Sequence, residues 1–288
     1  MILWIWGDNG ASMEGTITGS FNELTMQNGI PLTDEMQLQL SERYGGLDAW
    51  GAAAMDPHYG AAWAWAGNTP FKWGKQVGSH LGGTRNPLVV HGPGRVRDAG
   101  APALVVQPRH RRGAHDPRRR RDPSPQSVDG IEQEPMHGST FAALLTDGDA
   151  PEHRNQQYFE TIANRAMYQD GWWLAMKTER IPWVLTPDAI RPYAPGVWDP
   201  DAGPAVLYCL PDDFTQAKDL AAEHPDKVAH RIWAGSMAAS SRQLGRPPRS
   251  DPKRHLCRSY RPAPGAAPGS PTETYSPQPL QARSAQTG

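Results

Sequence analysis

The stretch I-L-W-I-W-G-D-N-G, residues 2–10, decides the fold that we expect, because an apolar run ends directly at an acid and an amide. We interpret Ile2–Trp6 as a buried strand, with Asp8 and Asn9 at its carboxyl end. In open α/β sheets ligands bind outside the carboxyl ends of the strands. Carboxylate and carboxamide oxygens are ligands that Ca²⁺ or Mg²⁺ takes. The stretch is therefore consistent with half a metal site, although taken alone the Asn-Gly pair favours a simple turn.

Composition and charge exclude several classes of protein. The 288 residues carry 29 Lys plus Arg against 30 Asp plus Glu, so no overall field attracts nucleic acid or an anionic membrane. Two cysteines are too few for a disulfide framework or a cysteine zinc cluster. No stretch has the length of a membrane span, and residues 1–6 are too short for the apolar part of a signal peptide. The cellular compartment is left open.

The pattern along the chain predicts helices first and short strands later. Thr33 is expected to cap a helix that starts at Asp34 and that Gly45-Gly46 ends. Residues 88–90 are expected to form another short buried strand. Later apolar runs separated by turn residues predict a small antiparallel sheet. Its strands are expected at residues 157–160, 165–168, 172–176 and 206–210, with a helix beginning in residues 220–228.

Several longer motifs between Trp6 and Pro87 carry a family resemblance. They are G-D-N-G-A-S-M-E-G-T, S-F-N-E-L-T-M-Q-N-G-I-P-L-T, H-Y-G-A-A-W-A-W-A-G-N-T-P-F-K-W-G-K-Q-V and G-G-T-R-N-P. With them the chain resembles the later half of the catalytic domain of bacterial arylsulfatases, the type I sulfatases of the alkaline-phosphatase superfamily. The resemblance returns from about Val128 to Val228, through V-D-G-I-E-Q-E-P-M-H-G, Q-Y-F-E, D-G-W-W and D-L-A-A-E-H-P-D-K-V.

The resemblance implies a fold class and a division of the chain. The fold would be α/β, a partial sulfatase-like sheet with flanking helices, plus a small C-terminal antiparallel sheet subdomain. Residues 1–100 would be the later half of the catalytic domain, and residues 127–230 its end together with that subdomain. Between and after them lie an Arg/Pro-rich segment, 101–126, and a tail, 231–288, rich in Pro, Arg, Ser and Ala. Such compositions bury too little apolar surface to order themselves.

The same resemblance implies the chemistry of the site. Sulfatases attack the sulfur of a sulfate ester with a hydrated formylglycine, made from Cys or Ser in a C/S-x-P-x-R motif, while Ca²⁺ and basic side chains hold the sulfate oxygens. Asp8 and Asn9 would be metal ligands for Ca²⁺ or Mg²⁺. Lys75 matches the position of the lysine that contacts the sulfate, and a compact ammonium suits a tetrahedral oxyanion. The alternative for Lys75 is a solvated surface lysine.

Three further basic residues are candidates to line this site. Lys72 is a rival of Lys75, because the spacing to Gly82 does not decide between them. His80 and Arg85 could line the site or could serve the fold alone.

The nucleophile motif is missing from its expected place. Only seven residues precede Asp8, and they hold neither the motif nor an acidic pair. A match, S-D-P-K-R at residues 250–254, and a near match, C-R-S-Y-R at 257–261, lie in the tail and are interpreted as coincidences. We therefore expect a C-terminal fragment of an arylsulfatase, inactive as this chain, whose substrate class is a sulfate-ester small molecule.

Two other functions remain open at this point. Arg109–Arg121 holds seven arginines, which favours a non-catalytic module that binds polyanions, although the run lacks aromatic residues for base stacking. The chain could also be one half of a split sulfatase, completed by a separate N-terminal half.

The arginine run has a further explanation at the level of the gene. Back-translated and shifted by one base, Arg109–Ser124 can read V-I-D-V-A-P-T-I-L-D-A-A-G-I-P, which resembles the helix that sulfatases have here. We therefore hypothesise two compensating frame changes around residues 101–126 and a third near His230, which sequencing of the DNA would test.

Overall fold

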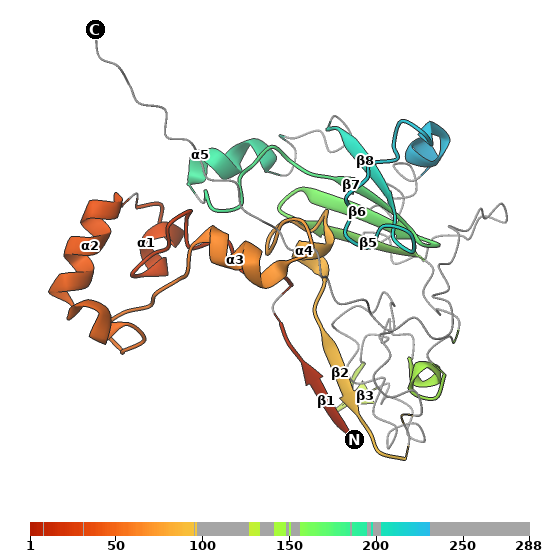
Figure 1. Ribbon diagram of the computed structural model, residues 1–288, viewed down its shortest axis with the longest axis horizontal. Helices are drawn as coiled ribbons and strands as arrows, with labels where there is room; N and C mark the ends of the chain where they lie inside the picture. The colour runs from red at the N-terminus through yellow and green to blue at the C-terminus, as the bar shows by residue number, and fades with distance from the viewer. Residues whose placement is uncertain are drawn as a thin grey trace, which may run out of the picture.

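The computed structural model describes a mixed fold of helices and strands. It describes residues 1–7, 9–30, 32–94, 96, 127–132, 141–147, 150, 156–184, 186–194, 197 and 203–230. Within this part of the chain the named strands form two two-stranded sheets and one four-stranded sheet, all antiparallel. Figure 1 shows α1 and α2 at one end of the molecule, the four-stranded sheet at the other, and the β1–β2 ribbon projecting between them.

The four-stranded sheet carries two of the buried clusters of the fold and confirms the predicted antiparallel sheet. It runs in the order β5 (Gln156–Thr161), β6 (Asn164–Gln169), β7 (Trp172–Met176) and β8 (Ala205–Cys209). β7 has the predicted bounds, and the other strands begin or end within one residue of them. Short strands joined by tight turns depend on local sequence, and so this part of the fold was predictable.

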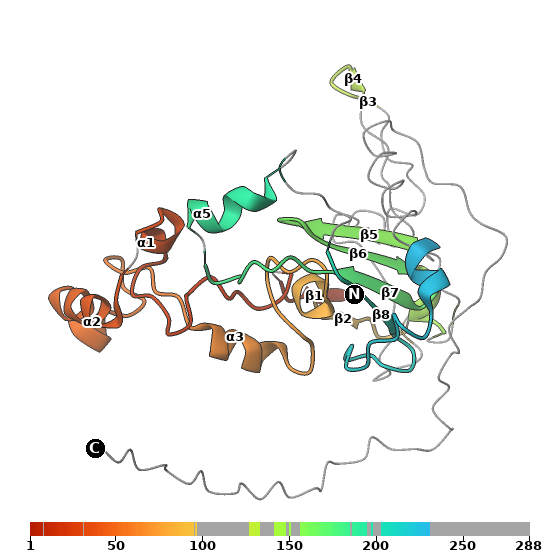
Figure 2. The same ribbon diagram turned by 90° about the horizontal axis from the view of Figure 1, so that it is seen from above.

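Both faces of this sheet are covered by other segments of the chain. Successive side chains of a strand point to opposite faces, so each strand contributes to both faces. Trp172 and Leu174 pack on one face, against Leu220 and Val228 of the segment that follows β8. The other face carries a second cluster. Its buried members are Leu81, Ala166, Tyr168, Trp173, Ala175 and Tyr208. The helical residues 225–230 and α4 (Leu81–Thr84) thus lie on opposite sides of the sheet. Figure 2 shows residues 225–230, in blue, beside the four-stranded sheet.

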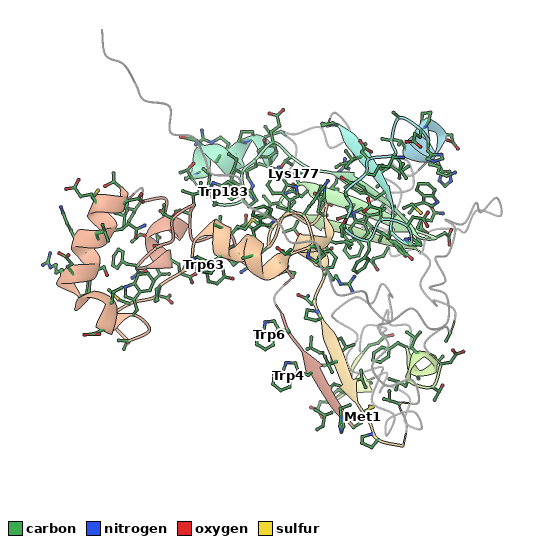
Figure 3. The ribbon with its side chains drawn as sticks, viewed as in Figure 1. Met1, Trp4, Trp6, Trp63, Lys177 and Trp183 are labelled. Atoms are coloured by element: carbon green, nitrogen blue, oxygen red, sulfur yellow. The ribbon has the colours of Figure 1, made fainter. Side chains whose placement is uncertain are left out.

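The N-terminal strand is exposed, and the expectation that it is buried was wrong. β1 (Ile2–Ile5) pairs antiparallel with β2 (Leu88–His91), so both predicted strands exist. They are not buried: Trp4 is 60% exposed and its partner Val89 is 61% exposed. Figure 3 shows Trp4 and Trp6 pointing outward on the same side of the ribbon, where their rings stack 6.4 Å apart. Among the described strands β1 pairs with β2 alone, and a two-stranded ribbon cannot cover its own faces.

The helices lie mostly in the first third of the chain. Thr33 caps α2 (Asp34–Arg43) as predicted, because its hydroxyl oxygen accepts from the Met36 amide at 3.2 Å. Gly45 and Gly46 end it with φ values of 112° and 68°, a region that glycine adopts readily. The other short helices and strands are α1 (Glu23–Gln27), η1 (Gly46–Ala49), α3 (Ala61–Asn68), β3 (Ser127–Val128), β4 (Ile131–Glu132), η4 (Ala142–Leu145), α5 (Pro187–Ile190) and η5 (Arg191–Tyr193).

Two predicted segments cannot be compared with this fold. Residues 101–126 and 231–288 lie outside the described residues, and the arginine run lies there with them. In the part that is described, no helix is both long and apolar enough to cross a membrane.

Candidate functional site

The loop after β1 is held by segments that lie far away in the sequence. The Ala11 amide donates to the side-chain oxygen of Asn68 at 3.0 Å, and the Asn68 amide nitrogen donates to the carbonyls of Trp73 and Gly82. The Lys75 amide donates to the Ala11 carbonyl at 2.9 Å. Asn68 therefore joins the G-D-N-G loop, the K-W-G-K segment and the G-G segment into one cluster.

The close approach at Gly10 explains why a glycine stands there. Its φ is +87°, and a Cβ at this position would lie 1.7 Å from the Gly82 carbonyl oxygen. Asn9, just before it, also has a positive φ of 53°. The Asn-Gly pair thus forms the turn that the sequence favours, and the turn brings the loop against the G-G segment.

Asn9 carries a buried polar atom for which the described residues offer no partner. Its amide nitrogen donates to the side-chain oxygen of Asn86 at 2.7 Å. Its own side-chain oxygen, Oδ1, is buried and has no hydrogen-bond donor among the described residues. Leaving such an oxygen unsatisfied costs about 1–3 kcal/mol. A divalent cation takes carboxamide oxygens as ligands, so Asn9 Oδ1 fits a cation site.

The described residues do not supply the rest of the expected metal site. Asp8, the second predicted ligand, lies outside the described residues. Within the described ranges no group of three or more His, Cys, Asp or Glu side chains is placed to hold a metal ion. Since Ca²⁺ takes roughly six to eight oxygens, Asn9 accounts for one of them.

Lys75 lies beside the same loop and pairs with Glu14. Its Nζ is 3.1 Å from Glu14 Oε2, and both side chains are partly buried. Gln76 Nε2 donates to the other carboxylate oxygen at 2.5 Å, and the Arg180 guanidinium donates to Gln76 Oε1 at 2.5 Å. Burial raises the pKa of Glu14, but the hydrogen bonds from Gln76, Lys75 and Ser12 outweigh it, so the pKa lies below its usual value. The carboxylate is therefore charged at neutral pH and holds the ammonium in place.

Lys72, His80 and Arg85 lie in a different group. Lys72 Nζ is 5.4 Å from the ring centre of Tyr208, and the Arg85 guanidinium is 4.2 Å from the ring centre of Phe214. Burial lowers the pKa of Arg85. Both cations thus stack on aromatic rings, a contact that stabilises the fold.

His80 is buried at the start of α4. Its Nδ1 lies 2.9 Å from the Ser79 hydroxyl oxygen. Burial, and to a smaller degree the positive charges of Lys72 and Lys177, lower the pKa of His80 to about 3. The imidazole is therefore neutral at neutral pH and serves the packing of α4 on the sheet.

Sequence reasoning missed several residues of this cluster. Glu14, Gln76, Asn68 and Asn86 hold the loop and the lysine in place, but none of them was singled out from the sequence. A signal did exist for Glu14, because it is the single acid in the loop that follows Asn9, G-A-S-M-E-G. Nothing local could have indicated the two asparagines, since their partners lie 57 and 77 residues away.

Comparison with known proteins identifies no family for this chain. No protein-family model matches this chain, and no curated protein is found to be similar to it.

Proposed function

We propose that this chain carries part of the site of a sulfuric ester hydrolase of the arylsulfatase type. The observation that carries the proposal is Asn9 Oδ1, a buried oxygen that no described residue donates to, in a loop that three distant segments hold. The proposal joins this observation to the family resemblance of the motifs around Asn9 and Lys75. The partial sulfatase-like sheet and the division of the chain that the resemblance implies belong to the same proposal.

Each residue has a role in this proposal. Asn9, with Asp8 by resemblance, would hold a divalent cation, Ca²⁺ or Mg²⁺, which supplies positive charge for the sulfate oxygens when it is bound. Lys75 would donate to another sulfate oxygen. The Glu14 carboxylate would hold the ammonium of Lys75 in place for this contact.

Cation binding at Asn9 can be measured with Tb³⁺, which replaces Ca²⁺ and emits light when a nearby tryptophan is excited. Wild-type protein is expected to sensitise Tb³⁺ emission, and Ca²⁺ should displace it. Asn9→Ala should lose most of this emission, because an oxygen ligand is removed. Asn28→Ala is the matched control, since Asn28 is exposed at the end of α1 and bonds only locally among the described residues. Equal Tb³⁺ binding by wild type and Asn9→Ala would contradict the metal site.

Sulfate recognition needs a second measurement. In the presence of Ca²⁺, 4-methylumbelliferyl sulfate is expected to bind wild-type protein. Quenching of tryptophan fluorescence measures this binding. Lys75→Met should weaken this binding by about tenfold or more, because a charge-assisted hydrogen bond is lost. Lys218→Met is the control, since Lys218 also pairs with a glutamate, Glu223 at 3.0 Å, but lies exposed elsewhere. Unchanged binding by Lys75→Met would argue against a sulfate site here.

A further inference from the structure

Ser12 and His58 form a close pair in the same region. The Ser12 hydroxyl oxygen lies 2.8 Å from His58 Nε2, and His58 Nδ1 lies 2.8 Å from the carbonyl oxygen of Tyr59. A carbonyl oxygen can only accept, so in the neutral ring Nδ1 carries the hydrogen. The lone pair of Nε2 then faces the serine hydroxyl. This is the arrangement of a nucleophile, a base and a group that orients the base.

The histidine is held rigidly at this place. Its backbone pairs with Ser20 in both directions, with N–O distances of 2.8 and 2.9 Å. Gly15 lets the imidazole approach, because a Cβ there would lie 2.5 Å from His58 Nδ1 and 2.0 Å from the Tyr59 carbonyl oxygen. The Ser12 amide donates to the Tyr59 hydroxyl at 3.2 Å, which holds the serine side of the pair. The pair is therefore organised before any substrate arrives.

Charge near the hydroxyl comes from Lys75. Ser12 Oγ and Lys75 Nζ both contact the same carboxylate oxygen, Glu14 Oε2, at 3.0 and 3.1 Å. The ammonium and the hydroxyl are thus held by one carboxylate oxygen, and a cation near an attacked carbonyl stabilises the negative charge that develops on it. A hydroxyl has one hydrogen, so Ser12 donates either to Glu14 or to His58, and the second state is the reactive one. Ser12 and His58 are both partly exposed, so a small molecule can reach them.

We propose that Ser12 is a nucleophile, with His58 as its general base, for the hydrolysis of small carboxylic esters. Ser12 Oγ bonds to the ester carbonyl carbon while its proton passes to His58 Nε2. The bond from that carbon to the leaving oxygen then breaks, and His58 returns the proton to the leaving oxygen. Water repeats the sequence on the acyl-serine and releases the acid. This activity shares Lys75 with the proposed sulfate site, but its nucleophile and base, Ser12 and His58, belong to neither the metal site nor the sulfate contact, so the two can be tested apart.

A fluorophosphonate probe tests the nucleophile directly on the whole chain. Ser12 Oγ would bond to phosphorus, fluoride would leave, and His58 would take the proton. Peptide mass spectrometry of the wild-type protein is expected to find the adduct on Ser12. Ser12→Ala should give no adduct at this peptide, and His58→Gln should slow labelling by about 100-fold or more. Ser127→Ala and His91→Gln, which change exposed residues on other strands, should label at the wild-type rate.

Ester turnover gives the second readout. Hydrolysis of 4-nitrophenyl acetate is expected to fall to the rate in buffer without protein in Ser12→Ala, while Ser127→Ala and His91→Gln keep the wild-type rate. Ser12→Cys should keep part of this hydrolysis, because a thiol also attacks an activated ester. Wild-type protein that carries no adduct on Ser12 would overturn the proposal, and Ser12 would then serve only to shape the loop through the Glu14 amide. That result would leave Tb³⁺ and aryl sulfate binding unaffected, so the two proposals fail separately.

Discussion

At the scale of single residues, buried polar side chains decide how this molecule holds together. His80, 4% exposed, is kept neutral by its surroundings, and Asn68 joins three segments through one amide group. A buried polar group stabilises a fold only where its partners are complete, because an unmet donor or acceptor costs about 1–3 kcal/mol. Within the described part of the chain Asn9 Oδ1 is left without a donor, which is why a ligand is proposed there and at no other described asparagine.

His80 predicts how stability depends on pH. Its pKa is about 3 in the folded chain and roughly 6.5 when unfolded, so the folded state binds fewer protons between these values. The stabilising contribution is complete above about pH 6.5 and is lost as pH falls toward 3, at up to ~1.4 kcal/mol per pH unit. Urea unfolding at several pH values should therefore show a shallower pH dependence for His80→Gln than for wild type. Parallel curves would show that His80 is not buried in its neutral form.

At the scale of elements, β7 stabilises the fold by burying side chains on both faces of the four-stranded sheet. Trp173 is 1% exposed, donates from Nε1 to the Ser79 carbonyl at 2.8 Å, and lies 4.9 Å from Phe159 between ring centres. It therefore joins the sheet to the segment that precedes α4. By contrast, Trp63 on α3 is 75% exposed and is labelled on the outer surface in Figure 3.

These two tryptophans make a matched pair of mutations. Trp173→Ala is expected to lower the free energy of unfolding by about 3–5 kcal/mol, because it leaves a cavity and an unmet carbonyl. Trp63→Ala should change it by no more than about 0.5 kcal/mol, as exposed substitutions usually do. Denaturant titration followed by circular dichroism measures both. Equal losses would mean that the two faces of the sheet are not packed as described.

At the scale of the whole molecule, the four-stranded sheet is well buried and the β1–β2 ribbon is not. The four-stranded sheet is covered by α4 on one face and by residues 220–228 on the other, while the β1–β2 ribbon exposes large apolar side chains. An isolated two-stranded ribbon is marginally stable in water. Regions with few buried contacts open first.

Hydrogen exchange should follow this division. Backbone amides of β6 and β7 are expected to exchange slowest, while those of β1 and β2 exchange at least about 100-fold faster, because local opening of the ribbon exposes little additional apolar surface. Mass spectrometry of peptic fragments reports both regions in one experiment. Exchange from β1 as slow as from β7 would show that a partner or another segment covers the ribbon in solution.

The sequence by itself determined the local elements of this protein. The Thr33 cap, the Gly45-Gly46 stop and the strands of the antiparallel sheet were predictable, because capping, glycine φ and short apolar runs act over a few residues. The bend at Asn9-Gly10 was predictable for the same reason. The roles of Asp8 and Asn9 as ligands and of Lys75 as a sulfate contact stay predictions.

Only the tertiary structure decided burial and partnership. In the folded chain Trp4 is exposed and Lys75 forms an ion pair with Glu14. The Ser12 hydroxyl contacts the His58 imidazole, although the two residues are 46 positions apart in the sequence. Gln216, fully buried, accepts from the Leu81 amide 135 residues away and fixes α4 against the sheet. Such contacts depend on the path of the whole backbone, whereas pattern and propensity act along a few neighbouring residues. For this reason the elements could be predicted and the geometry of the site could not.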